Sequence, residues 1–293
     1  MKIKYKSNWP VYIVAFIVAS AVVGLFAWNY YSEEIQPKIG GGSGNFSDYR
    51  PDGDLDTTFI VMLSESKGVV PAYYMMINYR PRDNVAVVVP LRPNTSLIDG
   101  RKIRTIQATY KSGSDDALRR GIRDTFGVDC KYYLKLDRSS FINLIDMFGA
   151  VPVNIAHDIG GTSPFRAGSH ALDGAQLYDY ISYPDYAEGE DYRYVIHGSV
   201  ITSLINKRAK GLTTSTMQSM FTLISNNADT NFTMDDYTRY QKAFQYTCDT
   251  GTDIATTVIP GGGVSDSAAD GGTIFTVSPS SVDNIKRQFN TTD

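Results

Sequence analysis

Three short apolar runs, rich in β-branched and aromatic residues, stand out in the chain after residue 56. They cover residues 57–64, 72–79 and 84–91, and turn-forming residues separate them. Such runs predict β-strands, and consecutive strands joined by short turns usually pair antiparallel. We therefore expect a hairpin between the second and third strands, with its turn at residues 79–84.

The next stretch alternates between helical and strand patterns. Residues 114–126 predict a helix that begins after Ser114 and stops at Gly127. Residues 130–136 and 151–155 predict strands on either side of a second helix at 139–148. The apolar side chains of that second helix recur at i, i+3, i+4 and i+7, as Phe141, Leu144, Ile145 and Phe148.

Helical patterns prevail in the second half of the chain. Five segments have one: 175–183, 192–210, 216–226, 234–245 and 281–289. Residues 255–259 and 273–277 predict two short strands around a loop rich in Gly, Ser and Asp. Because helices and strands mix without strict βαβ alternation, we expect an α/β or α+β layered fold, with a mixed, largely antiparallel central sheet flanked by helices.

A different pattern marks the N-terminus, where no charged residue occurs from Trp9 to Trp28. This run of 20 residues is long enough for a helix to cross a hydrocarbon core of roughly 30 Å. Tryptophan at both edges is typical of the membrane interface. We therefore expect a transmembrane helix at residues 9–28. A cleaved signal peptide is the alternative, since small residues occur at 19–21, but the apolar run continues past them.

The charges around this run predict its orientation. Lysines at positions 2, 4 and 6 precede the run, and Glu33 and Glu34 follow it, so the positive-inside rule places residues 1–8 in the cytoplasm. Residues 29–56, rich in Gly, Ser, Asp and Pro, predict a flexible linker. Residues 57–293 then form an extracytoplasmic domain of a single-pass protein of the cell membrane.

The charge balance argues against a nucleic-acid partner. The chain has 28 Lys and Arg; without the three N-terminal lysines 25 remain, against 31 Asp and Glu. A nucleic-acid-binding domain normally carries a basic surface instead. Cys130 and Cys248 would both lie in a compartment that permits disulfides, and the sequence leaves open whether they pair.

Short motifs between residues 104 and 155 carry a family resemblance. In order they are IQATY (106–110), a glycine at 113, FGV (126–128), YYLKLD (132–137) and LIDMFGAVPV (144–153). In order and spacing this stretch resembles the LytR-CpsA-Psr family, the membrane-anchored enzymes that attach glycopolymers to the bacterial cell wall. Weaker similarity extends from about residue 57 to about residue 289.

The resemblance implies a substrate and a cofactor. Members of the family bind a polyprenyl-pyrophosphate-linked glycan and, with Mg²⁺, transfer its phosphoglycan to a peptidoglycan acceptor. Arginines hold the pyrophosphate, aspartates hold the metal, and the prenyl tail lies in an apolar cavity. The chemistry is consistent, because guanidinium groups bind phosphate oxygens in bidentate fashion and carboxylates suit Mg²⁺.

Compared position by position, the strand motifs of the family are altered here. The charged R-x-D-T run that begins the second strand is replaced by an uncharged stretch that includes Tyr73 and Tyr74. The P-R-D-T motif that ends the third strand retains Arg92 and Thr95, whereas Asn94 follows Pro93 where an aspartate is expected. The resemblance implies that Arg92, Asn94 and Thr95 bind substrate. A Pro-Arg-Asp triplet at 81–83 is similar to this motif, but we expect it in the hairpin turn.

The helix motifs are altered as well. An A-L-x-Y-x-R-x-R run appears at 176–183 without its arginines, and with tyrosines that include Tyr180 and Tyr183. In the D-x-G-R-x-x-R-Q motif, Asp191 and Arg193 remain. The resemblance implies that Arg193 binds phosphate, as a catalytic residue together with Arg92, and that Asp191 holds the metal. A helix-start residue and a solvated surface charge are the alternatives for Asp191 and Arg193.

Other basic residues have no counterpart in these motifs. They are Arg101, Lys102, Arg104 and Lys111, followed by Arg119, Arg120 and Arg123, which we expect on the solvated face of the helix at 114–126.

Two functional hypotheses follow. The first is an enzyme, a glycopolymer phosphotransferase of the cell envelope. The second is a non-catalytic relative that binds lipid or glycan with a degenerate site, because loss of metal-binding carboxylates removes much of the charge neutralisation that phosphoryl transfer needs.

Overall fold

The computed structural model describes residues 49–100, 102–112, 114–159, 164–184, 186, 189–208, 210, 212–265 and 272–289. No described helix combines the length and the apolar character that a membrane crossing requires. The predicted cytoplasmic segment 1–8, the predicted anchor 9–28 and the linker up to residue 48 lie outside the described residues.

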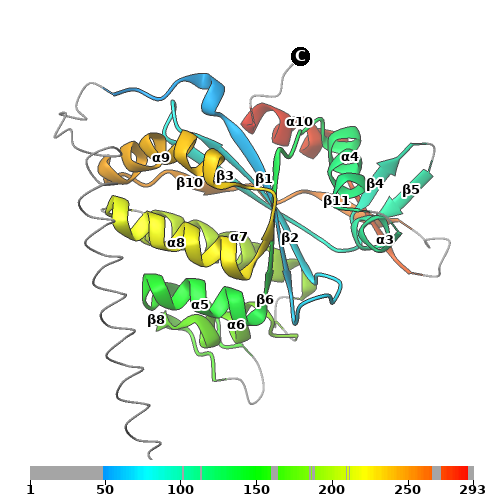
Figure 1. Cartoon of the computed structure of the whole chain (residues 1–293). Helices are drawn as coiled ribbons and strands as arrows, with labels where there is room; N and C mark the ends of the chain where they lie inside the picture. The colour runs from blue at the N-terminus through cyan, green and yellow to red at the C-terminus, as the bar shows by residue number, and fades with distance from the viewer. Residues whose placement is uncertain are drawn as a thin grey trace, which may run out of the picture. The chain divides into compact units, whose positions relative to one another are not determined.

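A six-stranded sheet forms the centre of the domain, in the order β10-β3-β2-β1-β6-β9 (Figure 1). Its strands are β1 (Thr57–Ser64), β2 (Tyr73–Arg80), β3 (Val85–Leu91), β6 (Tyr132–Asp137), β9 (Asp229–Thr230) and β10 (Ala255–Thr257). The β1–β2, β2–β3 and β6–β9 pairs are antiparallel, whereas β1–β6 and β3–β10 are parallel. The predicted mixed sheet flanked by helices is confirmed.

The hairpin between β2 and β3 also lies where the sequence predicts it. Arg80 pairs with Val85 in the register, so the Pro-Arg-Asp triplet at 81–83 lies in the turn. Asn84 has a φ of 54°, a left-handed conformation that Asn tolerates better than most residues.

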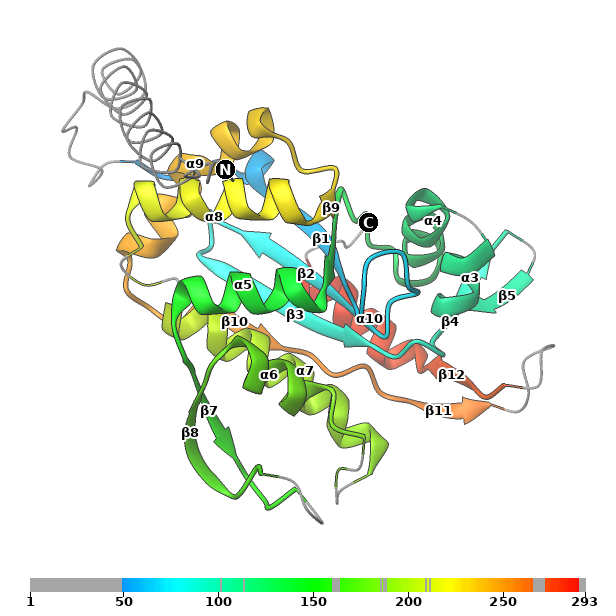
Figure 2. The same ribbon diagram turned by 60° about the horizontal axis from the view of Figure 1, so that its bottom comes forward.

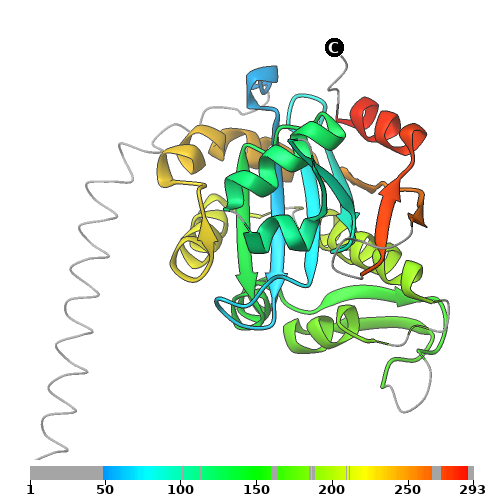
Figure 3. The ribbon, with the colours of Figure 1, turned by 90° about the vertical axis from the view of Figure 1, so that its right-hand side faces the viewer.

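Helices cover both faces of the sheet because its strands alternate their apolar side chains. Ile60, Met62 and Met76 point to one face. That face is covered by α3 (Ile106–Ser112), α4 (Asp115–Phe126) and α10 (Pro279–Gln288), and Figure 3 looks onto it with α3 and α4 in front. The other face packs against α5 (Arg138–Phe148), α6 (Gly174–Ile181), α7 (Glu190–Arg208) and α9 (Met234–Asp249), and α8 (Thr214–Asn227) contacts α5 and α9.

Three two-stranded ribbons lie outside the central sheet (Figure 2). They are β4 (Ser96–Asp99) with β5 (Lys102–Thr105), β7 (Val151–Ile155) with β8 (Gly168–Leu172), and β11 (Gly262–Ser265) with β12 (Ile274–Val277). Of these six strands, β7 and β12 lie where the sequence predicts strands, whereas the other four strands and α3 were not predicted. These elements are short and the missed strands contain many polar residues, so their hydrophobic periodicity is weak.

The two cysteines do not form a disulfide. Cys130 and Cys248 are both buried free thiols. Burial raises the pKa of Cys130 to about 12 and that of Cys248 to about 11, so neither thiol is a reactive thiolate at neutral pH.

Candidate functional site

The ends of β1, β3 and β6 lie side by side with the start of β2. We call this end of the strands the Arg92 edge. The register pairs Ser64 at the end of β1 with Asp137 at the end of β6. It also pairs Tyr74 near the start of β2 with Leu91 at the end of β3. Residues that follow β1, β3 and β6 are therefore brought together with the start of β2, although they are far apart in the sequence.

Arg92 is the first residue after β3, and its guanidinium lies between two aromatic rings. Its central carbon is 3.7 Å from the ring centroid of Phe275 and 5.1 Å from that of Tyr194. Its Nη1 donates to Asp191 Oδ1 over 2.6 Å. Only 15% of the Arg92 side chain is exposed, against 78% of that of Asp191. We call this group of four residues the Arg92 cradle.

The backbone around Arg92 is fixed by a turn and by a contact with the C-terminal segment. Thr95 N donates to the Arg92 carbonyl at 2.9 Å, and Phe275 N donates to the Asn94 carbonyl at 2.9 Å. Thr95 is only 1% exposed and forms an isolated bridge with Phe275. Asn94 Nδ2 lies 3.4 Å from Thr273 Oγ1. Thr95 and Asn94 thus hold the cradle in place, and Thr95 has almost no surface to offer a substrate.

Arg193 lies on the first turns of α7, two residues after Asp191. One of its terminal nitrogens donates to the Pro184 carbonyl at 2.7 Å, whereas its Nε is buried without a hydrogen-bond partner. The structure therefore brings Arg92 and Asp191 into direct contact. It directs Arg193 instead toward the segment that connects α6 to α7.

His197, one helical turn beyond Arg193, is buried beneath this edge. Its Nε2 lies 3.0 Å from the Ile181 carbonyl. Its ring meets those of Tyr73 and Tyr194 edge-on, at centroid distances of 4.9 Å and 5.7 Å. Burial lowers the pKa of His197 to about 4, and the positive charge of Arg193 lowers it slightly while the hydrogen bond to Ile181 raises it. His197 is therefore neutral at pH 7.

Tyr73 and Tyr74 face opposite sides of the sheet, as neighbouring strand residues must. Tyr73 packs against His197 at the Arg92 edge, within the uncharged stretch that replaces the R-x-D-T run implied by the resemblance. Tyr74 is 1% exposed in the core beneath α3 and α4, where burial raises its pKa. Only Tyr73 of this pair contributes to the site.

Glu65 is a candidate that the sequence analysis misses. It follows β1 at the Arg92 edge, is exposed, and its Oε2 accepts a hydrogen bond from the Tyr178 hydroxyl at 2.5 Å. Arg138 lies 5.1 Å from the centroid of the Tyr178 ring and pairs with Asp179 at 3.3 Å. A carboxylate directly after a buried strand is the signal that could have found it, since such positions lie at a sheet edge.

Asp137, at the end of β6, has a structural role. Its carboxylate accepts from Ser140 N at 2.8 Å and so caps α5. That backbone hydrogen bond, together with hydrogen bonds from the Ser139 and Ser140 side chains, lowers the pKa of Asp137.

The carboxylates of the described residues do not form a metal site by themselves. No group of three or more His, Cys, Asp or Glu side chains is close enough within that part of the chain. The carboxylate of Asp191 is already balanced by Arg92. Mg²⁺, however, often takes only one or two carboxylates and completes its shell with substrate phosphates and water. Glu65, which pairs with no cation among the described residues, fits that kind of shared site.

Comparison with known proteins gives these features a context. The model of the LytR_cpsA_psr family matches residues 71–291. The polyisoprenyl-teichoic acid–peptidoglycan teichoic acid transferase TagU of Bacillus licheniformis is 27% identical over 175 residues, which are 59% of this chain and 57% of TagU. The chain thus matches a little more than half the length of that relative.

Solved structures share the fold. A crystal structure from Eubacterium siraeum has a TM-score of 0.75 at 23% identity, covering 86% of this chain and 98% of that one. TagT bound to LIIa-WTA has a TM-score of 0.66 at 15% identity, covering 86% of this chain and 96% of TagT. With the family model matching most of its length, the chain belongs to the LytR_cpsA_psr family.

Proposed function

We propose that this chain is a cell-envelope transferase that moves a polyprenyl-pyrophosphate-linked glycopolymer onto peptidoglycan. The name of TagU describes that type of reaction for a relative, and the solved structure of TagT, which shares the fold, has LIIa-WTA bound. The observation in this chain that carries the proposal is the Arg92 cradle, in which a mostly buried guanidinium is held at a sheet edge and pairs with the exposed carboxylate of Asp191.

The cradle suits a phosphate for two reasons. The rings of Phe275 and Tyr194 restrict the Arg92 side chain, so little rotamer freedom is lost when a ligand binds. Asp191 is well exposed, and an exposed ion pair contributes little free energy. A pyrophosphate can therefore replace Asp191 and form charge-assisted hydrogen bonds with Arg92.

The proposed reaction forms one P–O bond and breaks another. An acceptor hydroxyl oxygen bonds to the phosphorus that carries the glycan, and the P–O–P bond breaks. The polyprenyl phosphate leaves with the bonding electron pair, and the hydroxyl proton passes to solvent at the exposed edge. Arg92 would stabilise the charge on the phosphate oxygens during transfer. Glu65 would hold Mg²⁺, which supplies further charge neutralisation when it is bound.

A second candidate is a relative that binds the lipid-linked glycan without transferring it. The contact between Tyr73 and neutral His197 favours it, because this position has neither a carboxylate nor a net charge. Such a protein would keep phosphate binding at Arg92 and lack the metal chemistry.

One experiment separates the two candidates. The full chain is incubated with a polyprenyl-pyrophosphate-linked glycan and Mg²⁺ or Mn²⁺, and both binding and P–O–P cleavage are followed. The test variant is Arg92→Ala, and the control is Arg239→Ala, which removes an exposed arginine paired with Asp54. Metal-dependent cleavage lost only in Arg92→Ala supports the transferase. Binding without cleavage supports the second candidate, and the absence of both refutes the two together.

The proposed location rests on the N-terminal sequence. Residues 9–28 would anchor the chain in the cell membrane, with residues 1–8 in the cytoplasm and residues 57–293 outside. Protease added to intact protoplasts should then degrade the domain and leave the N-terminal segment protected. A domain that resists protease until the membrane is permeabilised would show the opposite orientation.

A further inference from the structure

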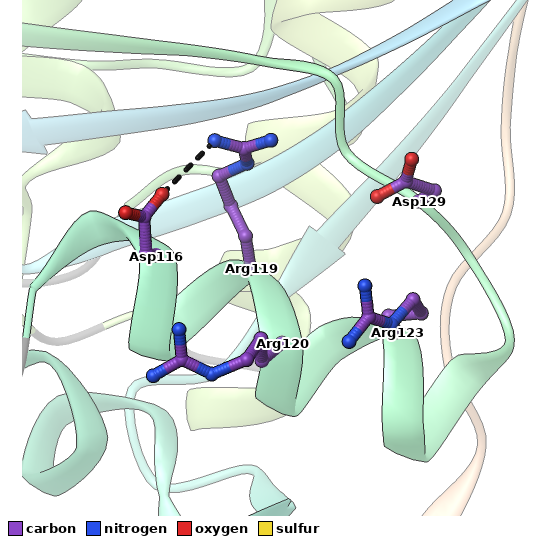
Figure 4. A pocket seen from close by; sticks show the side chains of 5 residues that line it. All are labelled: Asp116, Arg119, Arg120, Arg123 and Asp129. Atoms are coloured by element: carbon purple, nitrogen blue, oxygen red, sulfur yellow. Dashed lines mark hydrogen bonds and ion pairs between the residues drawn. The ribbon is translucent and has the colours of Figure 1, made fainter.

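A second group of arginines lies on α4, outside the Arg92 cradle. Arg119, Arg120 and Arg123 line an open depression together with two aspartates, Asp116 and Asp129 (Figure 4). We call it the α4 depression. Its residues have no counterpart among the family motifs found in the sequence.

The α4 depression lies toward the other end of the strands, opposite the Arg92 edge. Asp129 lies in the segment that leads into β6, and β6 pairs in parallel with β1 from Phe59 and Tyr132 onward. The Arg92 edge contains the far ends of these two strands, Ser64 and Asp137. The two groups of arginines therefore form separate sites.

Arg119 forms a fixed part of the depression. Its Nε donates to the Cys130 carbonyl at 2.6 Å, and its Nη1 pairs with Asp116 Oδ1 at 3.2 Å. Only 25% of its side chain is exposed. The bond to Cys130 ties α4 to the segment before β6 and so joins the two sides of the depression, whereas the pair with Asp116 lies within α4.

The other two arginines are available to a ligand. Arg120 is exposed and has no ion-pair partner among the described residues. Arg123 is 52% exposed, and its Nε lies 3.6 Å from Asp124, a long contact that contributes little free energy at the surface. Lys286 of α10 is another cation of this region, since its side chain packs against Gly127, the residue that ends α4.

The surroundings of the depression indicate a hydrophilic anion. Three arginines outnumber the two aspartates that line it, so it carries a net positive charge in a protein of net charge −3. The exposed large apolar residues of the described chain include none from α4 or α10, whereas membrane-inserting surfaces combine basic with apolar side chains. Guanidinium groups favour phosphate oxygens as ligands.

We propose that the α4 depression binds backbone phosphates of an anionic glycopolymer chain, away from the reacting pyrophosphate. The identity of the polymer rests on the proposed function, because it would be the distal part of the same donor or of a polymer already attached to the wall. Binding of one chain at two separate sites raises the overall affinity for long chains above that for short ones.

The test uses the full chain and two probes of the same chemistry, long poly(glycerol phosphate) and monomeric glycerol phosphate. The variant is the double substitution Arg120→Ala with Arg123→Ala, and Arg239→Ala is the matched control. We expect the double variant to bind the polymer about tenfold more weakly, with a flatter dependence on salt concentration, because two phosphate contacts are lost. The monomer should bind weakly to every protein, and the control should match the wild type.

Three results would overturn the proposal. In the first, the double variant binds the polymer as tightly as the wild type. In the second, wild-type protein binds phosphatidylglycerol vesicles more tightly than the polymer and the double variant loses that binding, which would assign the depression to a membrane surface. In the third, the monomer binds as tightly as the polymer.

A parallel assay keeps this proposal distinct from the proposed function. Cleavage of a lipid-linked donor with a short glycan should be unchanged in the double variant, since neither arginine belongs to the Arg92 edge. If no protein cleaves that donor but polymer binding still depends on Arg120 and Arg123, the transferase proposal is refuted and the α4 proposal stands.

Discussion

The Arg92 edge and the α4 depression both present arginine to solvent, in two different ways. At the Arg92 edge, one guanidinium is mostly buried, lies between two rings and has one carboxylate partner. On α4, Arg120 is exposed and 52% of the Arg123 side chain is exposed. Burial and stacking prepare a site for one phosphate group in one geometry, whereas exposed arginines suit a repeating anion whose position varies. The comparison predicts unequal effects of the same arginine-to-alanine change.

Arg92→Ala should have the largest effect. Loss of two charge-assisted hydrogen bonds to phosphate is expected to weaken binding of a polyprenyl pyrophosphate by about 100-fold or more. Arg92→Lys keeps the charge and should recover only part of the affinity, because an ammonium lacks the planar fork. Titration of the ligand against both variants measures this. If Arg92→Ala binds the polyprenyl pyrophosphate with wild-type affinity, the Arg92 cradle is not part of the binding site.

The next effect concerns the free energy of unfolding, which should depend on pH through His197 at the Arg92 edge and not through the arginines of the α4 depression. Because the pKa of His197 is lowered to about 4, the unfolded chain, where the His pKa is about 6.5, binds more protons between these values. Stability is therefore complete above about pH 6.5 and falls as the pH drops toward 4, by about 3 kcal/mol in total.

Urea unfolding at several pH values between 7 and 4 measures this loss. His197→Gln, which cannot titrate in this range, should lose much less stability across the window, whereas Arg120→Ala should behave like the wild type. An equal loss in His197→Gln and in the wild type would assign the acid sensitivity to other groups.

Asp191→Asn should have a smaller effect of opposite sign. It removes the carboxylate that competes for Arg92, so affinity for the pyrophosphate in metal-free buffer should rise about threefold to tenfold, the equivalent of about 1 kcal/mol. Calorimetry with and without Mg²⁺ provides the measurement. Weaker binding that appears only with Mg²⁺ would instead support Asp191 as a metal ligand.

The smallest expected change is that in the free energy of unfolding of Arg120→Ala, and Arg92→Ala provides the comparison. Arg92→Ala loses two ring contacts and should unfold with a free energy about 1–2 kcal/mol lower than the wild type. Arg120→Ala should change that free energy by no more than about 0.5 kcal/mol, because surface substitutions usually do not exceed this. Thermal or urea unfolding of the two variants gives the comparison, and equal losses would contradict the difference in burial.

The sequence predicts the long, strongly periodic elements of this fold well. The helix predicted at 114–126 begins after Ser114 and ends at Gly127, which has a φ of 67°. The ribbon of β4 and β5 was not predicted, because its strands have four residues each and their pairing depends on contacts rather than on periodicity. A short segment carries too little pattern to be distinguished from a loop.

The sequence singles out candidate site residues but not their arrangement. The family motifs single out Arg92 and Asp191, yet their contact joins the end of β3 to the start of α7, between residues 99 positions apart in the sequence. The role of Phe275 depends on the docking of β12 beside Thr95, and no local signal in the sequence announces it. Tertiary packing determines which of the motif residues meet.

The position of Phe275 in the chain has a consequence for biosynthesis. This residue forms one wall around Arg92 and bridges to Thr95, although it is made long after β3. Contacts between residues so distant in sequence form late in folding. A chain cut or terminated before residue 275 would keep the strands β1 to β3 and lack the ring beneath Arg92. The complete Arg92 cradle, and the phosphate binding proposed for it, would then require synthesis to proceed past residue 275, and products truncated before that residue would lack both.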